Sequence, residues 1–363
     1  MREASARDTS RARDRTLESR AIACRLALRV CVLAGDDPGE PRCEDDAAWT
    51  RVWNLFYPAE AYVKPKKPAG RAHSHTHTAA TMGGIDGDEY RVSEAMIEAF
   101  ERDGYVHIPG VLTDAEMAEV EEPMMRFIKG EVLPEGKDLC DMSGAVDRTP
   151  DEYTVFNAML PRRYLPSMQN NVFERRAASI ARQLTRGKSM SIDYDQLLAK
   201  RPNSPDSVFA WHQDLAYWPP LETDPATTTC WLAIDDSTVQ NGCMRFLPGS
   251  NKEPALRKHA PVKIGGGRLD ETSSHALATT LSPADEAAVR MVPINRGDIT
   301  VHDQRVVHGS GPNNSQGWRR AYVLAFRTAE MVNEERALGF SHSHNDEFNW
   351  DAFHAWQEKD DAE

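Results

Sequence analysis

One apolar, aromatic-rich stretch of the chain reads Phe209-Ala210-Trp211-His212-Gln213-Asp214-Leu215-Ala216-Tyr217-Trp218. Its composition is typical of a β-strand, but an imidazole and a carboxylate are set into it two residues apart. In an extended strand, positions i and i+2 point to the same face, with Cα atoms about 6.5 Å apart. The spacing therefore predicts that His212 and Asp214 reach one shared atom, and a metal ion suits that pair of ligands.

A second His-x-Asp triplet occurs at His344-Asn345-Asp346. It lies in a polar stretch without alternation, which favours a solvated loop. The first triplet has a partner downstream, a segment that ends in His308-Gly309-Ser310-Gly311-Pro312-Asn313. Two histidines and one carboxylate on one face of a metal leave three open positions, an arrangement typical of non-haem Fe(II) oxygenases. The two segments together predict one metal site.

The composition sets limits on the class of protein. A length of 363 residues with 40% hydrophobic residues allows one large or two ordinary domains. The net charge is −13, and residues 82–363 hold 29 Lys and Arg against 45 Asp and Glu. So acidic a body argues against nucleic acid as a partner. No apolar run approaches the ~18 residues that a membrane span requires.

The six cysteines form no Cys-x-x-Cys pair, which favours a reducing compartment. Cys230 and Cys243 are expected to be buried small hydrophobes. Residues 1–81 are rich in Arg but also contain acids, so they are predicted to be either a disordered or a targeting extension. The cytoplasm is the expected location, with a mitochondrion or plastid as the alternative, and Met82 is a candidate internal start. The triplet His73-x-His75-x-His77 is interpreted as part of a solvated tail.

The pattern changes from helices to strands along the chain. Amphipathic helices are predicted from Ser93 to Gly104, from the capping box at Thr113 to about Ile128, and over 171–185, with a short strand at 105–108 and irregular structure over 133–166. Strands are predicted at 190–199, 208–216, 228–234, 243–247, 291–295, 299–307 and 320–328. Helices followed by closely spaced strands predict an α+β fold with a double-sheet barrel or jelly roll.

The order and spacing of several motifs resemble the phytanoyl-CoA dioxygenase family of Fe(II)/2-oxoglutarate oxygenases over residues 92 to 330. The motifs are Phe100-Glu101-Arg102-Asp103-Gly104-Tyr105, Gly110-Val111-Leu112, Lys200-Arg201-Pro202, Trp211-His212-Gln213-Asp214, Asn241-Gly242-Cys243, Leu247-Pro248-Gly249-Ser250, His308-Gly309-Ser310-Gly311-Pro312-Asn313 and Arg319-Arg320-Ala321. The resemblance implies a double-stranded β-helix, the cupin-like jelly roll, with N-terminal and flanking helices. The expected dioxygenase domain is 82–330, followed by a C-terminal extension over 331–363.

Residue by residue, the resemblance implies Fe(II) bound by His212, Asp214 and His308. His302 is a local rival for His308, because six residues place both on one strand face if no bulge intervenes, and it is interpreted as structural or as a support of the site. Arg319 matches the arginine that pairs the far carboxylate of 2-oxoglutarate, a role that the planar guanidinium suits. Other matching positions are Ser310 and Gln196, expected to hydrogen-bond the cosubstrate, and Trp231, expected to line its pocket.

The implied reaction uses O2 and 2-oxoglutarate to hydroxylate an unactivated C–H bond, and it releases succinate and CO2. A carboxylate at position 214 favours hydroxylation, because related halogenases have a small residue there. The substrate is expected to be a small molecule or an acyl-CoA, with Tyr217 and Trp218 as candidate contacts or ordinary core residues. The segment 339–356 either folds over the barrel or forms a partner surface. The oligomeric state is not predicted. A non-catalytic jelly-roll binding or sensing module, and an oxygenase that halogenates, desaturates or hydroxylates a protein, remain alternatives.

Overall fold

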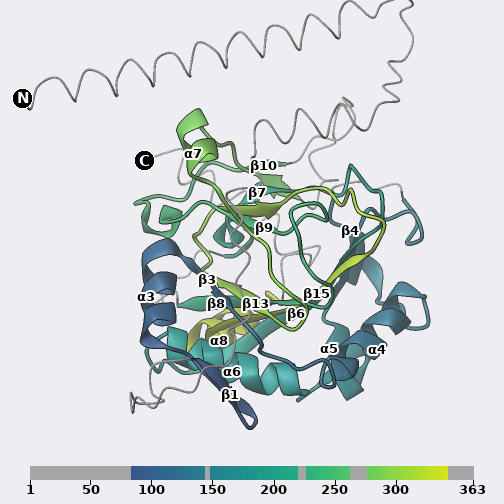
Figure 1. Ribbon diagram of the computed structural model, residues 1–363, viewed down its shortest axis with the longest axis horizontal. Coiled ribbons are helices and arrows are strands. Elements are labelled where there is room, and N and C mark those ends of the chain that lie inside the picture. The colour runs from purple at the N-terminus through teal and green to yellow at the C-terminus, as the bar shows by residue number, and fades with distance from the viewer. Residues whose placement is uncertain (1–82, 144–147, 220–225, 262–275, 342–363) are drawn as a thin grey trace, which may run out of the picture. The chain divides into compact units, whose positions relative to one another are not determined.

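The computed structural model describes residues 83–143, 148–219, 226–261 and 276–341. Its main feature is a pair of sheets in which every strand pairing between described residues is antiparallel (Figure 1). The seven-stranded sheet has the order β3 (Tyr105–Ile108), β13 (Ile299–His302), β8 (Thr227–Ala233), β15 (Arg319–Thr328), β6 (Met190–Lys200), β5 (Val155–Met159) and β4 (Leu139–Asp141). The four-stranded sheet has the order β12 (Arg290–Val292), β9 (Met244–Phe246), β14 (His308–Ser310) and β7 (Phe209–His212).

Two short hairpins accompany these sheets. They are β1 (Gly84–Asp86) with β2 (Glu89–Arg91), and β10 (Ala260–Pro261) with β11 (Leu277–Ala278). The architecture confirms the expected α+β class with a double-stranded β-helix core. The core strands β8 and β15 are buried along almost their whole length, because helices cover one face of their sheet and the interior of the barrel meets the other.

The described helices, apart from α7 (Pro283–Ala288), lie on the outer side of the seven-stranded sheet, whereas α7 precedes β12 of the four-stranded sheet (Figure 1). The helices are α3 (Glu94–Asp103), α4 (Ala118–Ile128), α5 (Pro161–Tyr164), α6 (Val172–Leu184), α7 and α8 (Ala329–Ala337), with 3-10 turns η2 (Gly136–Asp138), η3 (Pro166–Met168), η4 (Asp214–Tyr217) and η5 (Ser250–Lys252). Figure 1 shows α6 lying along the seven-stranded sheet, and it contacts β6, β8 and β15. Phe173 of α6 meets Tyr322 of β15 with ring centroids 5.6 Å apart. This packing makes the sheet a fixed support for residues on its inner face.

The predicted helices agree with the structure apart from their ends. Ser93 caps α3 by accepting a hydrogen bond from the Met96 amide, and Gly104 ends the helix at a φ of 78°. The capping box at Thr113 forms, since its hydroxyl accepts from the Glu116 amide and the Glu116 carboxylate accepts from the Thr113 amide. The box closes a separate turn, however, and α4 begins only at Ala118.

Two strand predictions and one prediction of irregular structure were wrong in ways that affect the site. The run 208–216 is a strand only to His212, and Asp214 opens η4 instead. The run 299–307 is not one strand, because the chain leaves β13 of the large sheet at His302 and enters β14 of the small sheet at His308. The irregular region 133–166 contains β4 and β5. Alternation alone did not reveal these breaks, since the residues between the strands are themselves buried or half-buried.

The described residues test only some of the other predictions. Cys230 and Cys243 are free and buried, as expected. None of the described helices is long and apolar enough to cross a bilayer. Residues 1–81, the triplet at His344 and residues 342–356 lie outside the described residues. The domain boundaries stay predictions, although α8 contacts β6 and β15.

Candidate active site

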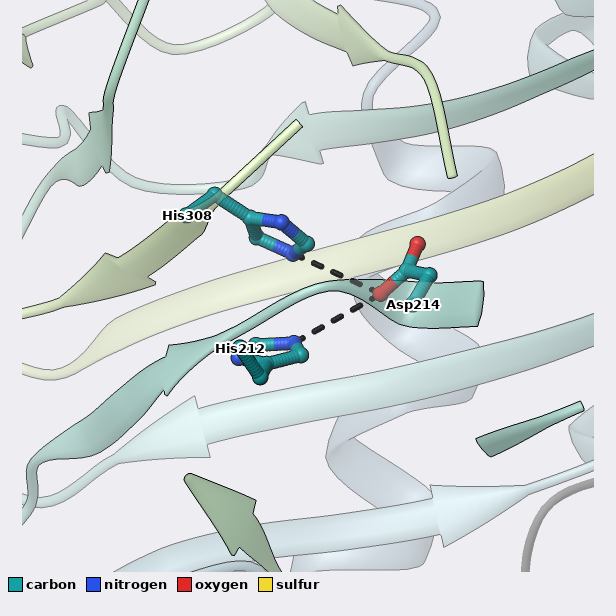
Figure 2. Close-up of side chains that lie close together, drawn as sticks. All are labelled: His212, Asp214 and His308. Carbon is teal, nitrogen blue, oxygen red and sulfur yellow. Dashed lines mark ion pairs between the residues drawn. The ribbon is translucent and has the colours of Figure 1, made fainter. Parts of the chain in front are cut away.

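Three buried side chains converge inside the barrel. His212 ends β7, Asp214 opens η4 and His308 opens β14. Oδ1 of Asp214 lies 3.5 Å from Nε2 of His212 and 3.5 Å from Nε2 of His308, as Figure 2 shows. The candidate ligand atoms all lie within 4.8 Å of one another. The structure therefore brings together the three residues predicted as metal ligands.

A β-bulge aims His212 into the barrel. His308 pairs with His212, but Ser310 pairs with Phe209, so three steps along β7 match two along β14. The extra residue turns both Phe209 and His212 toward the cavity, a use of bulges that is common beside active sites. Gly309 permits the bulge, because a Cβ there would lie 2.9 Å from the Phe209 carbonyl oxygen. The close approach of the two strands therefore explains why a glycine follows His308.

The two imidazoles are oriented by backbone carbonyls. Nδ1 of His212 lies 2.8 Å from the Ala210 oxygen, and Nδ1 of His308 lies 3.0 Å from the Val306 oxygen. A carbonyl only accepts, so each ring donates from Nδ1 and keeps the lone pair of Nε2 toward Asp214. Neutral rings with fixed tautomers are what a metal ligand requires.

The charges of the cluster also suit a divalent metal. Burial alone would raise the pKa of Asp214, but the neighbouring imidazoles of His308, His212 and His302 outweigh it and hold the pKa well below its usual range. Burial, reinforced by the neighbouring rings of His212 and His302, lowers the pKa of His308 far below its ordinary value. The set thus combines an ionised carboxylate with a neutral imidazole. Two nitrogens and one oxygen on one face fit Fe(II) with open positions, so these three residues could hold it.

His302 is near the cluster but faces a different atom. Its Nε2 lies 3.3 Å from Oδ2 of Asp214, the oxygen turned away from the other two rings, and its ring centroid lies 4.2 Å from that of His308. The prediction that His302 and His308 share one strand face was wrong, since they reach each other from different sheets. Its interpretation as a support of the site agrees with this contact to the carboxylate.

Gln213, between the two candidate ligands, ties the segment to two other parts of the chain. The backbone amide of Gln213 donates to Nε2 of His259 at 3.1 Å. Its side-chain oxygen accepts from the Arg257 amide at 3.0 Å, and its side-chain nitrogen donates to the Arg305 carbonyl at 2.6 Å. Sequence reasoning missed this clamp, because the three partners are far from Gln213 in sequence.

Arg319 on the cavity wall and Lys200 behind it are two buried cations, and neither makes an ion pair with a carboxylate of the described residues. Arg319 is 2% exposed, and its Nε and Nη1 have no hydrogen-bond partner in the part of the chain that the structure describes. Lys200, opposite it on β6, is fully buried and donates to Oγ of Ser310 at 2.6 Å. Burial lowers the pKa of Arg319 to about 10, and burial with Arg319 alongside lowers that of Lys200 well below its usual value. An unpaired buried charge is costly, so the pair fits an anionic ligand such as the far carboxylate of 2-oxoglutarate.

Sequence reasoning gave Lys200 no role. The only signal was its place in the motif Lys200-Arg201-Pro202, and the cross-strand pairing with Arg319 could not be read from the chain. Ser310, Gln196 and Trp231, predicted around the cosubstrate, line the same cavity as Arg319. The Trp231 ring lies 5.1 Å from the guanidinium of Arg319. Their contacts with 2-oxoglutarate stay predictions.

The rest of the cavity wall is apolar or aromatic. Tyr217 and Trp218, predicted as candidate substrate contacts, both line it. The Tyr217 hydroxyl is already held by the Leu277 amide, which donates to it at 2.7 Å. Apolar residues make up much of the remaining wall, including Met142, Val155, Met159, Phe209, Met244 and Val323. This region suits an uncharged ligand group.

Comparisons with known proteins agree on one family. A family model described as phytanoyl-CoA dioxygenase (PhyH) matches residues 100–321. The phytanoyl-CoA dioxygenase domain-containing protein 1 homolog of Caenorhabditis elegans is 26% identical over 263 residues, covering 62% of this chain and 88% of the relative. The peroxisomal phytanoyl-CoA dioxygenase of Bos taurus is 25% identical over 237 residues, covering 63% and 67%. The crystal structure of EvdO2 from Micromonospora carbonacea var. aurantiaca is 25% identical with a TM-score of 0.54, covering 69% and 94%.

Proposed function

The chain belongs to the phytanoyl-CoA dioxygenase family, and we propose on that basis that it hydroxylates an unactivated C–H bond of an uncharged, apolar group. It is an Fe(II)- and 2-oxoglutarate-dependent dioxygenase. The group attacked belongs to a small metabolite or to the acyl part of an acyl-CoA. Succinate and CO2 are released with the hydroxylated product.

One observation carries the proposal: a single cavity combines three kinds of wall. His212, Asp214 and His308 supply the ligand set of a divalent metal. Arg319, with Lys200 behind it, supplies positive charge that no carboxylate of the described residues neutralises. Apolar side chains supply the remaining surface. A metal, a dicarboxylate and an apolar group could therefore be held side by side.

Each part of the chain has a definite task in this reaction. His212, Asp214 and His308 would hold Fe(II), which when bound supplies the reduction of O2 coupled to decarboxylation of 2-oxoglutarate. Arg319 would pair the far carboxylate of 2-oxoglutarate and so orient its keto acid end toward the metal site. The apolar wall excludes water and holds the substrate's C–H bond in place.

The carboxylate of Asp214 favours hydroxylation over halogenation. Halogenation requires a halide at the metal in the position that this carboxylate takes. The Asp214 carboxylate is buried and has hydrogen-bond donors on its second oxygen, so it is not free to move aside. Product mass spectrometry with chloride present is expected to find a mass gain of one oxygen and no chlorine.

The charges around the cavity favour an uncharged substrate group. Among the described residues that line it, the charged or titratable ones other than tyrosine are Arg319 and the cluster of His212, Asp214, His302 and His308. All of these are assigned to 2-oxoglutarate or to the metal site, which leaves no partner there for an ammonium or a further carboxylate. The acyl chain implied by the name of the Bos taurus relative meets this requirement.

The proposal is tested by measuring succinate formed from 2-oxoglutarate after oxygen is admitted to protein loaded anaerobically with Fe(II). The panel contains acyl-CoAs of different chain length, small apolar alcohols and ketones, and amino acids. We expect an apolar member to stimulate succinate formation. The variant His212→Ala should lose this activity, and far-UV circular dichroism checks that it remains folded.

The same experiment separates the alternatives. Stimulation by amino acids alone would contradict the apolar substrate class. Failure of the wild-type chain to bind Fe(II) and 2-oxoglutarate would contradict the enzyme and favour a non-catalytic jelly-roll module.

A further inference from the structure

The two oxygens of the Asp214 carboxylate face different partners. Oδ1 lies 3.5 Å from Nε2 of His212 and 3.5 Å from Nε2 of His308. Oδ2 lies 3.1 Å from Oγ1 of Thr229 and 3.3 Å from Nε2 of His302. One oxygen is turned to the two imidazoles proposed as metal ligands, and the other is taken up by two side chains from the opposite sheet.

Thr229 and His302 form a fixed pair beneath the carboxylate. They lie on the adjacent strands β8 and β13, whose register places His302 directly opposite Thr229. Directly opposed residues of an antiparallel pair share one face of the sheet. Their residues are 4% and 2% exposed. Asp214 itself opens the turn η4 after β7, so Thr229 and His302 hold its carboxylate from a second sheet.

The hydrogens can be assigned from the partners. The Thr229 hydroxyl donates to Oδ2 of Asp214. His302 also donates, from Nε2, because it lies 3.3 Å from Oδ2, and a carboxylate oxygen accepts hydrogen bonds. Nδ1 of His302 is buried and has no hydrogen-bond partner among the described residues. A buried nitrogen without a partner is costly, so the position of the His302 ring needs an explanation. The contact of its Nε2 with Oδ2 of Asp214 provides that explanation.

We infer that Thr229 and His302 are positioning residues that make Asp214 a one-oxygen metal ligand. This inference rests on the function proposed above. Carboxylates bind metal ions through one oxygen or through both. Three protein ligands leave three open positions, and the keto acid end of 2-oxoglutarate needs two of them. If Asp214 contributed its second oxygen as well, no position would remain for O2.

The test uses nitric oxide as a probe of the open position. Protein is loaded anaerobically with Fe(II) and 2-oxoglutarate and then exposed to nitric oxide, whose iron complex gives an electron paramagnetic resonance signal. The variants are Thr229→Val, His302→Leu and their combination, and the signal is divided by the amount of bound iron. Fe(II) affinity is measured on the same proteins by anaerobic titration.

The chain offers a matched control in Thr228, the preceding residue of β8. Its hydroxyl is buried and has no hydrogen-bond partner, so Thr228→Val makes the same substitution without touching the carboxylate. His302→Gln is the conservative variant, because its amide still provides an N–H donor.

We expect the signal per bound iron to be unchanged in Thr228→Val. In Thr229→Val it should fall about fivefold, the shift that loss of one hydrogen bond produces in an equilibrium between one-oxygen and two-oxygen binding. The double variant should fall further, and His302→Gln should retain more signal than His302→Leu. Fe(II) affinity should not fall, since a second carboxylate oxygen adds a ligand.

A wild-type signal per bound iron in the double variant would overturn the inference. A loss of Fe(II) affinity that parallels the loss of signal would also overturn it, because the two residues would then only support the fold of the site. Absence of Fe(II) binding by the wild-type chain would contradict the proposed function and with it this inference. That result would be obtained before any variant is compared, so the two failures can be distinguished.

Discussion

Strand β15 carries a buried arginine near each end, and the two have opposite surroundings. Arg319 and Arg327 are 2% and 1% exposed and lie eight residues apart, or roughly 26 Å along an extended strand. Nε of Arg327 lies 3.0 Å from Oδ2 of Asp193, and its Nη1 contacts the Glu335 carboxylate. Both arginines have two buried nitrogens without a hydrogen bond among the described residues, but Arg319 makes no ion pair with any of these residues.

The difference separates structural from binding charge. A buried guanidinium must be compensated, and Arg327 finds its compensation inside the protein, on β6 and α8. Arg319 has a second cation, Lys200, for a neighbour instead. The folded chain therefore keeps positive charge uncompensated at one end of β15, and an anionic ligand is the natural partner. Substitution of the two arginines should separate stability from binding.

The largest effect is expected for Arg327→Met. Removal of this side chain leaves Asp193 and Glu335 buried without it, and breaking a buried pair in this way costs about 3–5 kcal/mol. The free energy of unfolding, measured by urea denaturation, should fall by that amount. The control is Arg91→Met, whose partner Asp86 is exposed, and which should change stability by less than ~1 kcal/mol. Equal effects in the two variants would show that Arg327 does not hold the fold together.

Arg319→Met should have the opposite profile. We expect 2-oxoglutarate to bind about 100-fold more weakly, because a charge-paired hydrogen-bond partner of the bound ligand is lost. Stability should stay the same or rise, since the variant no longer buries an unpaired charge. Anaerobic calorimetry of 2-oxoglutarate binding and urea denaturation on the same preparation measure both quantities. Destabilisation like that of Arg327→Met would remove the contrast between the two ends.

The contrast also explains how far the sequence could be interpreted. His212, Asp214, His308 and Arg319 were found because short motifs mark them. Arg327 was not singled out, because its partners Asp193 and Glu335 are distant or lie on an unpredicted helix. Pairing across a sheet is a three-dimensional property, and no spacing along the chain encodes it.

The fold shows the same division. The α+β class followed from the order of helices and strands. The switch between sheets from His302 to His308 did not, because a continuous run of buried and half-buried residues looks the same whether it is one strand or two. That switch brings His302 to the far oxygen of Asp214. The support of the metal site was therefore the part least visible in the sequence.

Lys200→Met should have an intermediate effect, with 2-oxoglutarate affinity about tenfold lower. Burial, with Arg319 and Arg245 nearby, lowers the pKa of Lys200 well below its usual value. A bound carboxylate favours the charged amine, so binding raises this pKa and takes up a proton. Affinity should thus fall as pH rises above the pKa of the free protein and level off below it. Calorimetry in buffers of different ionisation enthalpy measures the proton uptake, and an unchanged uptake in the variant would assign it to another group.

The smallest effects concern the tryptophans over which both arginines lie. The Arg319 guanidinium carbon is 5.1 Å from the Trp231 ring centroid, and that of Arg327 is 3.3 Å from the Trp218 centroid. Phenylalanine keeps an apolar ring but attracts a cation less strongly, so Trp231→Phe should weaken 2-oxoglutarate binding by only about threefold. Trp218→Phe should instead lower the free energy of unfolding by about 1 kcal/mol. If Trp231→Phe weakened 2-oxoglutarate binding as much as Arg319→Met, the ring rather than the charge would define the binding end of β15. Calorimetry of the two variants at one pH decides between these causes.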